Sequence, residues 1–299
     1  MSLRKLLPLV APLGALPLAA QQFTLDSGAI TSGNIWTDGV EIADVDADGD
    51  NDILFANGSS YGGGGSQPQH LFLNDGSGSF TPAHAQLGVA NFNAKMVIAE
   101  DFDGDGDLDL MYSPEGPYPA TNQVPRILIN DGTGNFTNES ATRMPATTMA
   151  SFCVCAGDVD DDGDLDVVFT NGATFGGQPT QALLYLNDGN GFFTDATATN
   201  MPADTYNAQD VTLFDWQNNF RIDITLSGKG QTGKRGRLYT NTGGGNFTIQ
   251  SVLDNLGTGN TYEIDWATST ATVTSTASSS PSRARTKASR TTTSARSPA

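Results

Sequence analysis

Cysteine and histidine are both scarce, with two of each among 299 residues. Cys153 and Cys155 lie two residues apart, so in a strand they share one face. Their Cα atoms would then be roughly 6.5–7 Å apart, at the upper limit for a disulfide, and we expect two small buried thiols on a core-facing strand. His70 and His84 lie in unrelated strand and hairpin positions, which argues against a metal site built from cysteine and histidine.

Recognisable catalytic motifs are also missing. The H-E-x-x-H motif of zinc proteases does not occur. A pair of free carboxylates suited to glycoside cleavage cannot be singled out, because so many of the acidic residues belong to repeated aspartate loops. The sequence therefore predicts that the protein is not an enzyme.

Basic residues are few: 15 Lys and Arg face 33 Asp and Glu, and the formal net charge is -18. Seven of the cations lie near the two ends of the chain, so the body alone carries about -25. Nucleic acid is not expected as a partner, because phosphate binding requires a basic surface.

The chain has no apolar run of the roughly 20 residues that a membrane-spanning helix needs. Residues 6–18 form a shorter apolar stretch that follows Arg4 and Lys5, and Leu18-Ala19-Ala20 offers a cleavage site before Gln21. This order is typical of a secretory signal peptide over residues 1–20. We therefore expect a secreted protein, extracellular or periplasmic, without a membrane span.

Aspartate, by contrast, is abundant and regularly placed. Nine-residue stretches read DVDADGDND from Asp44, DFDGDGDLD from Asp101 and DVDDDGDLD from Asp158, and a degenerate copy, DWQNNFRID, starts at Asp215. Successive starts are 57 residues apart. A period of this size indicates a repeat architecture in which each unit is one supersecondary element.

Each unit also contains the same strand and turn signals. An apolar run precedes the aspartate loop, a β-rich run follows it, and a hairpin comes last, for example LFLNDGSGSF from Leu71. Asn-Asp-Gly between two apolar runs predicts a turn, because glycine tolerates positive φ. Four short strands per unit predict an all-β, β-propeller-like array of four-stranded blades over residues 21–266, although a stacked solenoid is an alternative.

The aspartate loops are suited to calcium, which takes six to eight oxygen ligands in irregular geometry. A glycine at position 6 allows the sharp bend that such a loop needs (Gly49, Gly106 and Gly163). The expected carboxylate ligands at positions 1, 3, 5 and 9 are Asp44, Asp46, Asp48 and Asp52, then Asp101, Asp103, Asp105 and Asp109, then Asp158, Asp160, Asp162 and Asp166. The position-7 residues Asp50, Asp107 and Asp164 would add their backbone carbonyls.

Two other interpretations of these loops remain open. An acidic surface turn without a metal would have the same composition. Magnesium fits the loops less well than calcium does, because it demands near-octahedral geometry and keeps its bound waters. The loops lack the twelve-residue spacing and the terminal glutamate of a helix–loop–helix sensor, so the ions are expected to be structural clips.

The fourth loop is a poor calcium site. Gln217 and Asn219 replace two of the carboxylates, leaving Asp215 and Asp223, and Phe220 replaces the glycine. We expect about three calcium ions and an empty fourth loop. Our hypothesis is that Arg221 supplies an internal cation there by pairing with Asp215 or Asp223.

Residues 267–299 form a Ser-, Thr- and Ala-rich tail. Threonines alternate from Thr268 to Thr276, and a reading frame displaced by two bases can convert them into another aspartate loop. A disordered low-complexity tail is one interpretation, but we favour the frameshifted remainder of a truncated fifth repeat.

The pattern D-x-D-x-D-G-D-x-D, a β-run and then L-x-L-N-D-G-x-G-x-F resembles FG-GAP/VCBS repeats over about residues 36–262. It is also similar to the calcium-binding blades of integrin α-subunit propellers. The resemblance implies a β-propeller with calcium in the loops, usually of about seven blades, and an association with adhesion and recognition.

The function expected from these observations is an exported calcium-binding β-propeller that acts as a binding, adhesion or scaffold module for a protein or polysaccharide ligand. An accessory, non-catalytic portion of an extracellular polysaccharide-acting enzyme is an alternative. A nonfunctional truncated fragment is another.

Overall fold

The computed structural model describes residues 30, 35–59, 65–115, 123–172, 180–228 and 236–253. The expected signal peptide and the tail from residue 267 lie outside these residues. The described helices are three or four residues long, so none of them can cross a membrane.

Within these residues the chain forms four antiparallel sheets of four strands each, one per sequence repeat. Sheet 1 contains β1 (Thr37–Ala43), β2 (Asp52–Asn57), β3 (His70–Asn74) and β4 (Phe80–Pro82). Sheet 2 contains β5 (Ala94–Glu100), β6 (Asp109–Pro114), β7 (Arg126–Asn130) and β8 (Phe136–Asn138). Sheet 3 contains β9 (Val154–Gly157), β10 (Asp166–Phe169), β11 (Leu183–Asn187) and β12 (Phe193–Asp195). Sheet 4 contains β13 (Ala208–Phe214), β14 (Asp223–Gly228), β15 (Gly236–Asn241) and β16 (Phe247–Gln250).

Short helical turns follow the outer strand of each sheet. They are η1 (His84–Leu87), α1 (Ser140–Arg143), α2 (Thr197–Asn200) and η2 (Ser251–Leu253). The strands of every sheet pair in sequence order, so each repeat is a simple up-and-down meander. The prediction of four short strands per unit is thereby confirmed.

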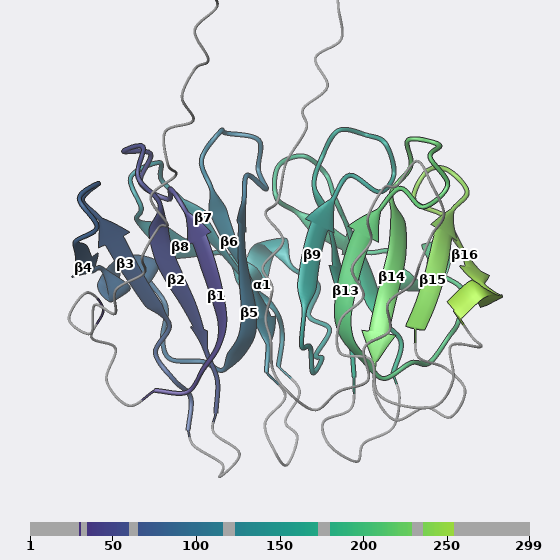
Figure 1. The fold of residues 1–299 in the computed structure, drawn as a ribbon, viewed down its shortest axis with the longest axis horizontal. Coiled ribbons are helices and arrows are strands. Elements are labelled where there is room, and N and C mark those ends of the chain that lie inside the picture. Colours follow the sequence, from purple (N-terminus) through teal and green to yellow (C-terminus); the bar gives the residue numbers. More distant parts are fainter. Residues whose placement is uncertain are drawn as a thin grey trace, which may run out of the picture.

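The sheets stand side by side in one row, with sheet 1 and sheet 4 at opposite ends (Figure 1). Successive residues of a strand point to opposite faces. In β6, Leu110 belongs to the apolar cluster shared with sheet 1, whereas Met111 belongs to the cluster shared with sheet 3. A third cluster joins Val168 of sheet 3 to Ile224 of sheet 4. The two middle sheets are therefore covered on both faces, as blades of a propeller-like fold are, and the described row is open.

Among the described residues, part of the first strand of sheet 1 is exposed on its outward face. Val40 and Ile42 are 41% and 47% exposed, whereas Val97 and Ala99, one repeat later, are 1% and 7% exposed. Packing against a preceding sheet accounts for the difference, because Val97 and Ala99 lie in the cluster between sheets 1 and 2.

The two histidines are in contact, although their sequence positions suggested that they were unrelated. His70 in β3 and His84 in η1 stack with ring centroids 4.1 Å apart and ring planes 11° apart. The ring of Phe72 meets both of them edge-on. Burial, and to a smaller extent His84, lower the pKa of His70, so the neutral ring is favoured. The contact joins β3 to the helical turn η1, which folds back onto that strand.

Both cysteines are free thiols, as expected. Cys153 is buried and Cys155 is half-buried, and the Cys155 thiol donates to the carbonyl oxygen of Val211 at 3.2 Å. The adjacent Cys155 thiol and burial together raise the pKa of Cys153. The pair therefore belongs to the packing between sheets 3 and 4.

Candidate metal centres

The four aspartate loops connect the first strand of each sheet to the second, and we number them 1 to 4 like the sheets. Loop 1, for example, begins at Asp44 and lies between β1 and β2. The position-1 carboxylate of each loop accepts a hydrogen bond from the backbone N–H at position 6. The distances are 3.0 Å for Asp44, 3.1 Å for Asp101 and 3.1 Å for Asp158. This bond closes the loop into a tight bend.

The bend needs a left-handed backbone at position 6. The φ angles there are 98° at Gly49, 100° at Gly106 and 101° at Gly163. Glycine adopts such angles without the steric cost that a Cβ atom would bring. The glycine predicted for the bend is thus confirmed by the backbone geometry.

The position-9 carboxylates have a different environment from the others, because Asp52, Asp109 and Asp166 are fully buried. In loop 3 one oxygen of Asp166 accepts the N–H of Val159 at 3.0 Å, and the other accepts the N–H of Asn187 at 2.9 Å. The other three loops contain the corresponding pair of bonds, with distances of 2.7 to 3.2 Å. Position 9 therefore ties the loop to the hairpin of its own sheet.

Burial is the main influence on these carboxyl groups. It raises the pKa of Asp109 and of Asp166 to about 7, against the opposing effect of the backbone hydrogen bonds. Burial and the neighbouring Asp105 also raise the pKa of Asp103, and Arg143 opposes that rise. A nearby cation would reverse these trends, because it favours the charged form of a carboxylate.

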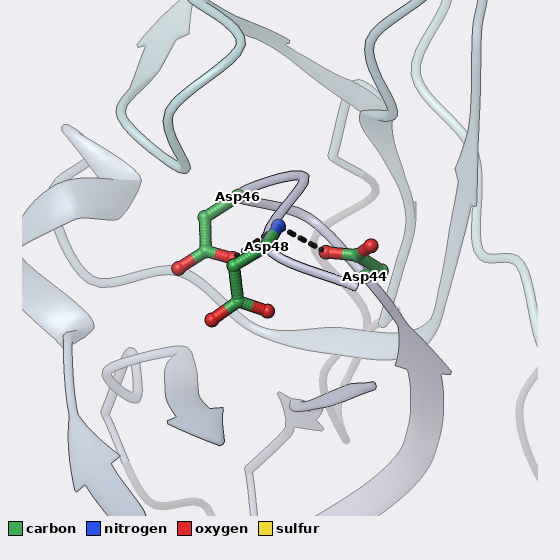
Figure 2. A group of neighbouring side chains, drawn as sticks. All are labelled: Asp44, Asp46 and Asp48. Atoms are coloured by element: carbon green, nitrogen blue, oxygen red, sulfur yellow. Dashed lines mark hydrogen bonds between the residues drawn. The ribbon is translucent and has the colours of Figure 1, made fainter. Parts of the chain in front are cut away.

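Three groups of carboxylates converge closely enough to hold a metal ion, with one oxygen of each residue within 4.8 Å of the others. The groups are Asp44, Asp46 and Asp48, then Asp101, Asp103 and Asp109, then Asp158, Asp160 and Asp166. Figure 2 shows the first group gathered around the bend of loop 1. Positions 1 and 3 are common to all three groups, and the third member differs between loop 1 and the other two.

The remaining predicted ligands lie outside these groups. Position-5 residues Asp105 and Asp162 each accept a backbone N–H two residues on, at 3.0 Å. The side chains of the position-7 residues lie against a hairpin glycine; the carboxylate of Asp164, for example, lies against Gly189. The role of the position-7 backbone carbonyls as ligands stays a prediction.

The donor set fits a hard cation. All of the converging atoms are carboxylate oxygens, which calcium prefers. The Oδ1 atoms of Asp103 and Asp160 are buried and have no hydrogen-bond partner among the described residues. A buried polar atom without a partner is energetically costly. A cation bound in each of these loops would give the oxygen atom there a partner.

Sequence reasoning missed one group of residues that the loops depend on. The hairpin pattern predicts no more than a turn at the asparagines that it contains, which are Asn130, Asn187 and the equivalent Asn241. The side-chain amide of Asn187 donates to the carbonyl oxygen of Phe102 in the preceding loop at 2.8 Å. Asn130 and Asn241 make the same bond to the preceding loop, at 2.8 and 2.6 Å. The repetition of Asn at the same hairpin position was the available signal.

The hypothesis about Arg221 is wrong in its choice of partner. The guanidinium of Arg221 lies 3.9 Å from Asp161 of loop 3, and the carboxylates of Asp215 and Asp223 accept backbone N–H groups instead. Loop 4 thus keeps the hydrogen-bonded scaffold of the others although two of its ligand positions are amides. The partner was not predictable because it belongs to the neighbouring repeat.

Replacing Phe220 with glycine is expected to raise the free energy of unfolding by about 1 kcal/mol, since a residue with a Cβ atom is strained in the left-handed region. Phe220 has φ 65° at the bend of loop 4 and is 95% exposed, so its removal loses little packing. Urea denaturation measures the change. Gly163→Ala is the matched control: a Cβ there meets nothing within 4 Å, so its expected destabilisation comes from the backbone alone. Equal stability of both variants and the parent would contradict the strain.

Comparison with known proteins agrees with the repeat structure. The FG-GAP-like repeat family matches residues 44–112 and 118–169. No curated protein matches the chain. A lectin from Agrocybe aegerita, described as recognising non-reducing terminal N-acetylglucosamine, is 20% identical with a TM-score of 0.42 and is matched over 73% of this chain and 52% of its own. The V. cholerae biofilm matrix protein Bap1 is 17% identical with a TM-score of 0.38, over 72% and 30%.

This chain therefore spans about half of the lectin and less than a third of the matrix protein. The match to the family model begins at loop 1 and ends with β10, so it covers the three intact aspartate loops. Together with the four-stranded sheets, it shows that the chain contains FG-GAP-like repeats.

Proposed function

We propose that the protein is an exported calcium-binding module of propeller-like sheets that binds a protein or polysaccharide ligand. The observation that carries the calcium proposal is the convergence of three carboxylates in each of three loops on one repeated scaffold. Export rests on the signal-like residues 1–20, and the binding role rests on the family to which the repeats belong.

Calcium would be held by the converging carboxylates, together with the backbone carbonyls at position 7. Five carboxylates fall within the nine residues of loop 1, and like charges at this density repel one another. A divalent ion turns that repulsion into attraction and fixes the loop between two strands. The proposed role of the ion is therefore to stiffen the sheets that present a binding surface.

A ligand screen tests the binding role directly. The purified full chain is applied to arrays of glycans and of extracellular matrix proteins, once with calcium and once with EDTA. We expect binding that EDTA abolishes. Equilibrium dialysis verifies that the sample contains calcium. If such a sample binds no ligand of any class, the binding role is contradicted but the calcium sites are not.

A further inference from the structure

The three intact loops are not electrostatically equivalent. On the basis of the calcium binding proposed for them, we propose that Arg143 lowers the calcium affinity of loop 2 (residues 101–109) below that of loops 1 and 3. The module would then fill two sites at low calcium concentration and the third only at a higher one.

Arg143 is the last residue of α1 and lies directly beside a member of the loop 2 group. Its Nη2 atom is 3.5 Å from Oδ2 of Asp103, and the side chains of both residues are 13% exposed. Asp103 converges with Asp101 and Asp109. A charge this close and this poorly hydrated is only weakly screened, in contrast to an ion pair on an open surface.

The guanidinium is held in place on its other sides. Its Nε atom pairs with Glu139 at 2.5 Å, and its Nη1 atom donates to the carbonyl oxygen of Asn190 in the next sheet. The ring of Phe192 lies 4.8 Å from it. These contacts hold the guanidinium beside Asp103, and Glu139 offsets part of its charge.

The corresponding residues of the neighbouring sheets are neutral. One repeat before Arg143 the chain has Gln86, and one repeat after it has Asn200. Asn200 makes a similar contact to the next hairpin, donating to the carbonyl oxygen of Gly245 at 3.1 Å, but brings no charge. A positive charge at this repeated position therefore distinguishes loop 2 from loops 1 and 3.

A second arginine lies near loop 3 but does not act in the same way. Arg221 approaches Asp161, which is not one of the converging carboxylates, at 3.9 Å. The two side chains are 42% and 50% exposed, so solvent screens the pair. Asp161 is also an extra acid that loops 1 and 2 lack, and Arg221 does no more than offset it.

Calcium affinity in flexible loops depends on the number of ligand charges and on site rigidity. A fixed positive charge beside one ligand reduces the effective charge of the site. With an effective dielectric of about 20 and partial compensation by Glu139, we expect roughly a tenfold weaker site.

Isothermal titration of the full chain with calcium chloride tests the proposal. The expected curve shows two classes of site, two ions bound tightly and one about tenfold more weakly. Asp101→Asn should remove only the weak class, which assigns it to loop 2. Arg143→Gln should move the weak class up to the affinity of the other two.

Two matched variants separate charge from structure. Arg143→Lys keeps the positive charge but loses the planar fork, so it should retain the weak site, whereas a purely structural role predicts the behaviour of Arg143→Gln. Asn200→Arg introduces the charge beside loop 3 and should create a second weak site. Three equivalent sites in the parent, or no effect of Arg143→Gln, would overturn the proposal, whereas failure to bind any calcium would overturn the proposed function instead.

Discussion

Calcium is expected to produce a large rise in the melting temperature of this chain. Each ion that binds only the folded state adds about 2.7 kcal/mol when its concentration is 100 times the dissociation constant. Three such sites together add about 8 kcal/mol, which is comparable to the whole stability of many domains, about 5–15 kcal/mol. The reason is the repulsion among carboxylates that the ion relieves in each of the three loops.

Differential scanning calorimetry in excess calcium and in EDTA measures this rise. Magnesium is the matched control, since it keeps its waters and its octahedral geometry and should stabilise much less. Identical unfolding in all three solutions would rule out calcium as a structural component.

The effect of calcium should also depend on pH. Without a metal, Asp109 and Asp166 have folded-state pKa values of about 7, raised by burial from 3.8. A carboxyl group with a raised folded pKa contributes stability that is present below its unfolded pKa and lost as pH rises through the folded value. The calcium-free protein should therefore lose stability between about pH 4 and 7. Calcium competes with those protons, so its affinity should increase over the upper part of the same interval.

Asp166→Ala should cause the largest loss among single substitutions in the loops. The buried carboxylate accepts the N–H groups of Val159 and Asn187, and each buried N–H left without an acceptor costs about 1–3 kcal/mol. We expect a total loss of about 3–5 kcal/mol in EDTA, measured by urea denaturation.

Two further variants show whether that loss comes from the scaffold or from the metal. Asp223→Ala breaks the same pair of backbone bonds in loop 4, where no calcium is expected, so it should destabilise the protein in EDTA but leave the calcium-induced stabilisation intact. Asp166→Ala should reduce that stabilisation as well. Asp161→Ala removes an exposed carboxylate of loop 3 and should change stability by no more than about 0.5 kcal/mol. Equal losses for Asp161→Ala and Asp166→Ala would contradict the role assigned to position 9.

Much of the fold was predictable because its signals lie within one repeat. The bend glycine at Gly163 and the Asn-Asp-Gly hairpin turns require particular backbone angles, and those angles dictate the residue type. The strands between them follow from short apolar runs. The sequence also identified the loops that contain the three converging groups.

The features that were not predictable depend on contacts between repeats. Nothing local to Arg221 shows that it faces Asp161, and nothing local to Asn187 shows that it reaches Phe102. The nine-residue pattern also treats its aspartates alike, although Asp166 is a buried acceptor of two backbone bonds and Asp162 caps a turn. Burial separates these roles, and burial follows from how one sheet packs on the next.

The hairpin asparagines give the row of sheets a polarity. Asn130, Asn187 and Asn241 all reach backward, each to the loop of the preceding sheet. When one loop is disordered, the asparagine of the following sheet loses its acceptor, whereas the asparagine of the loop's own sheet keeps its bond to the loop before. The loss of order is therefore expected to spread toward the C-terminal sheets.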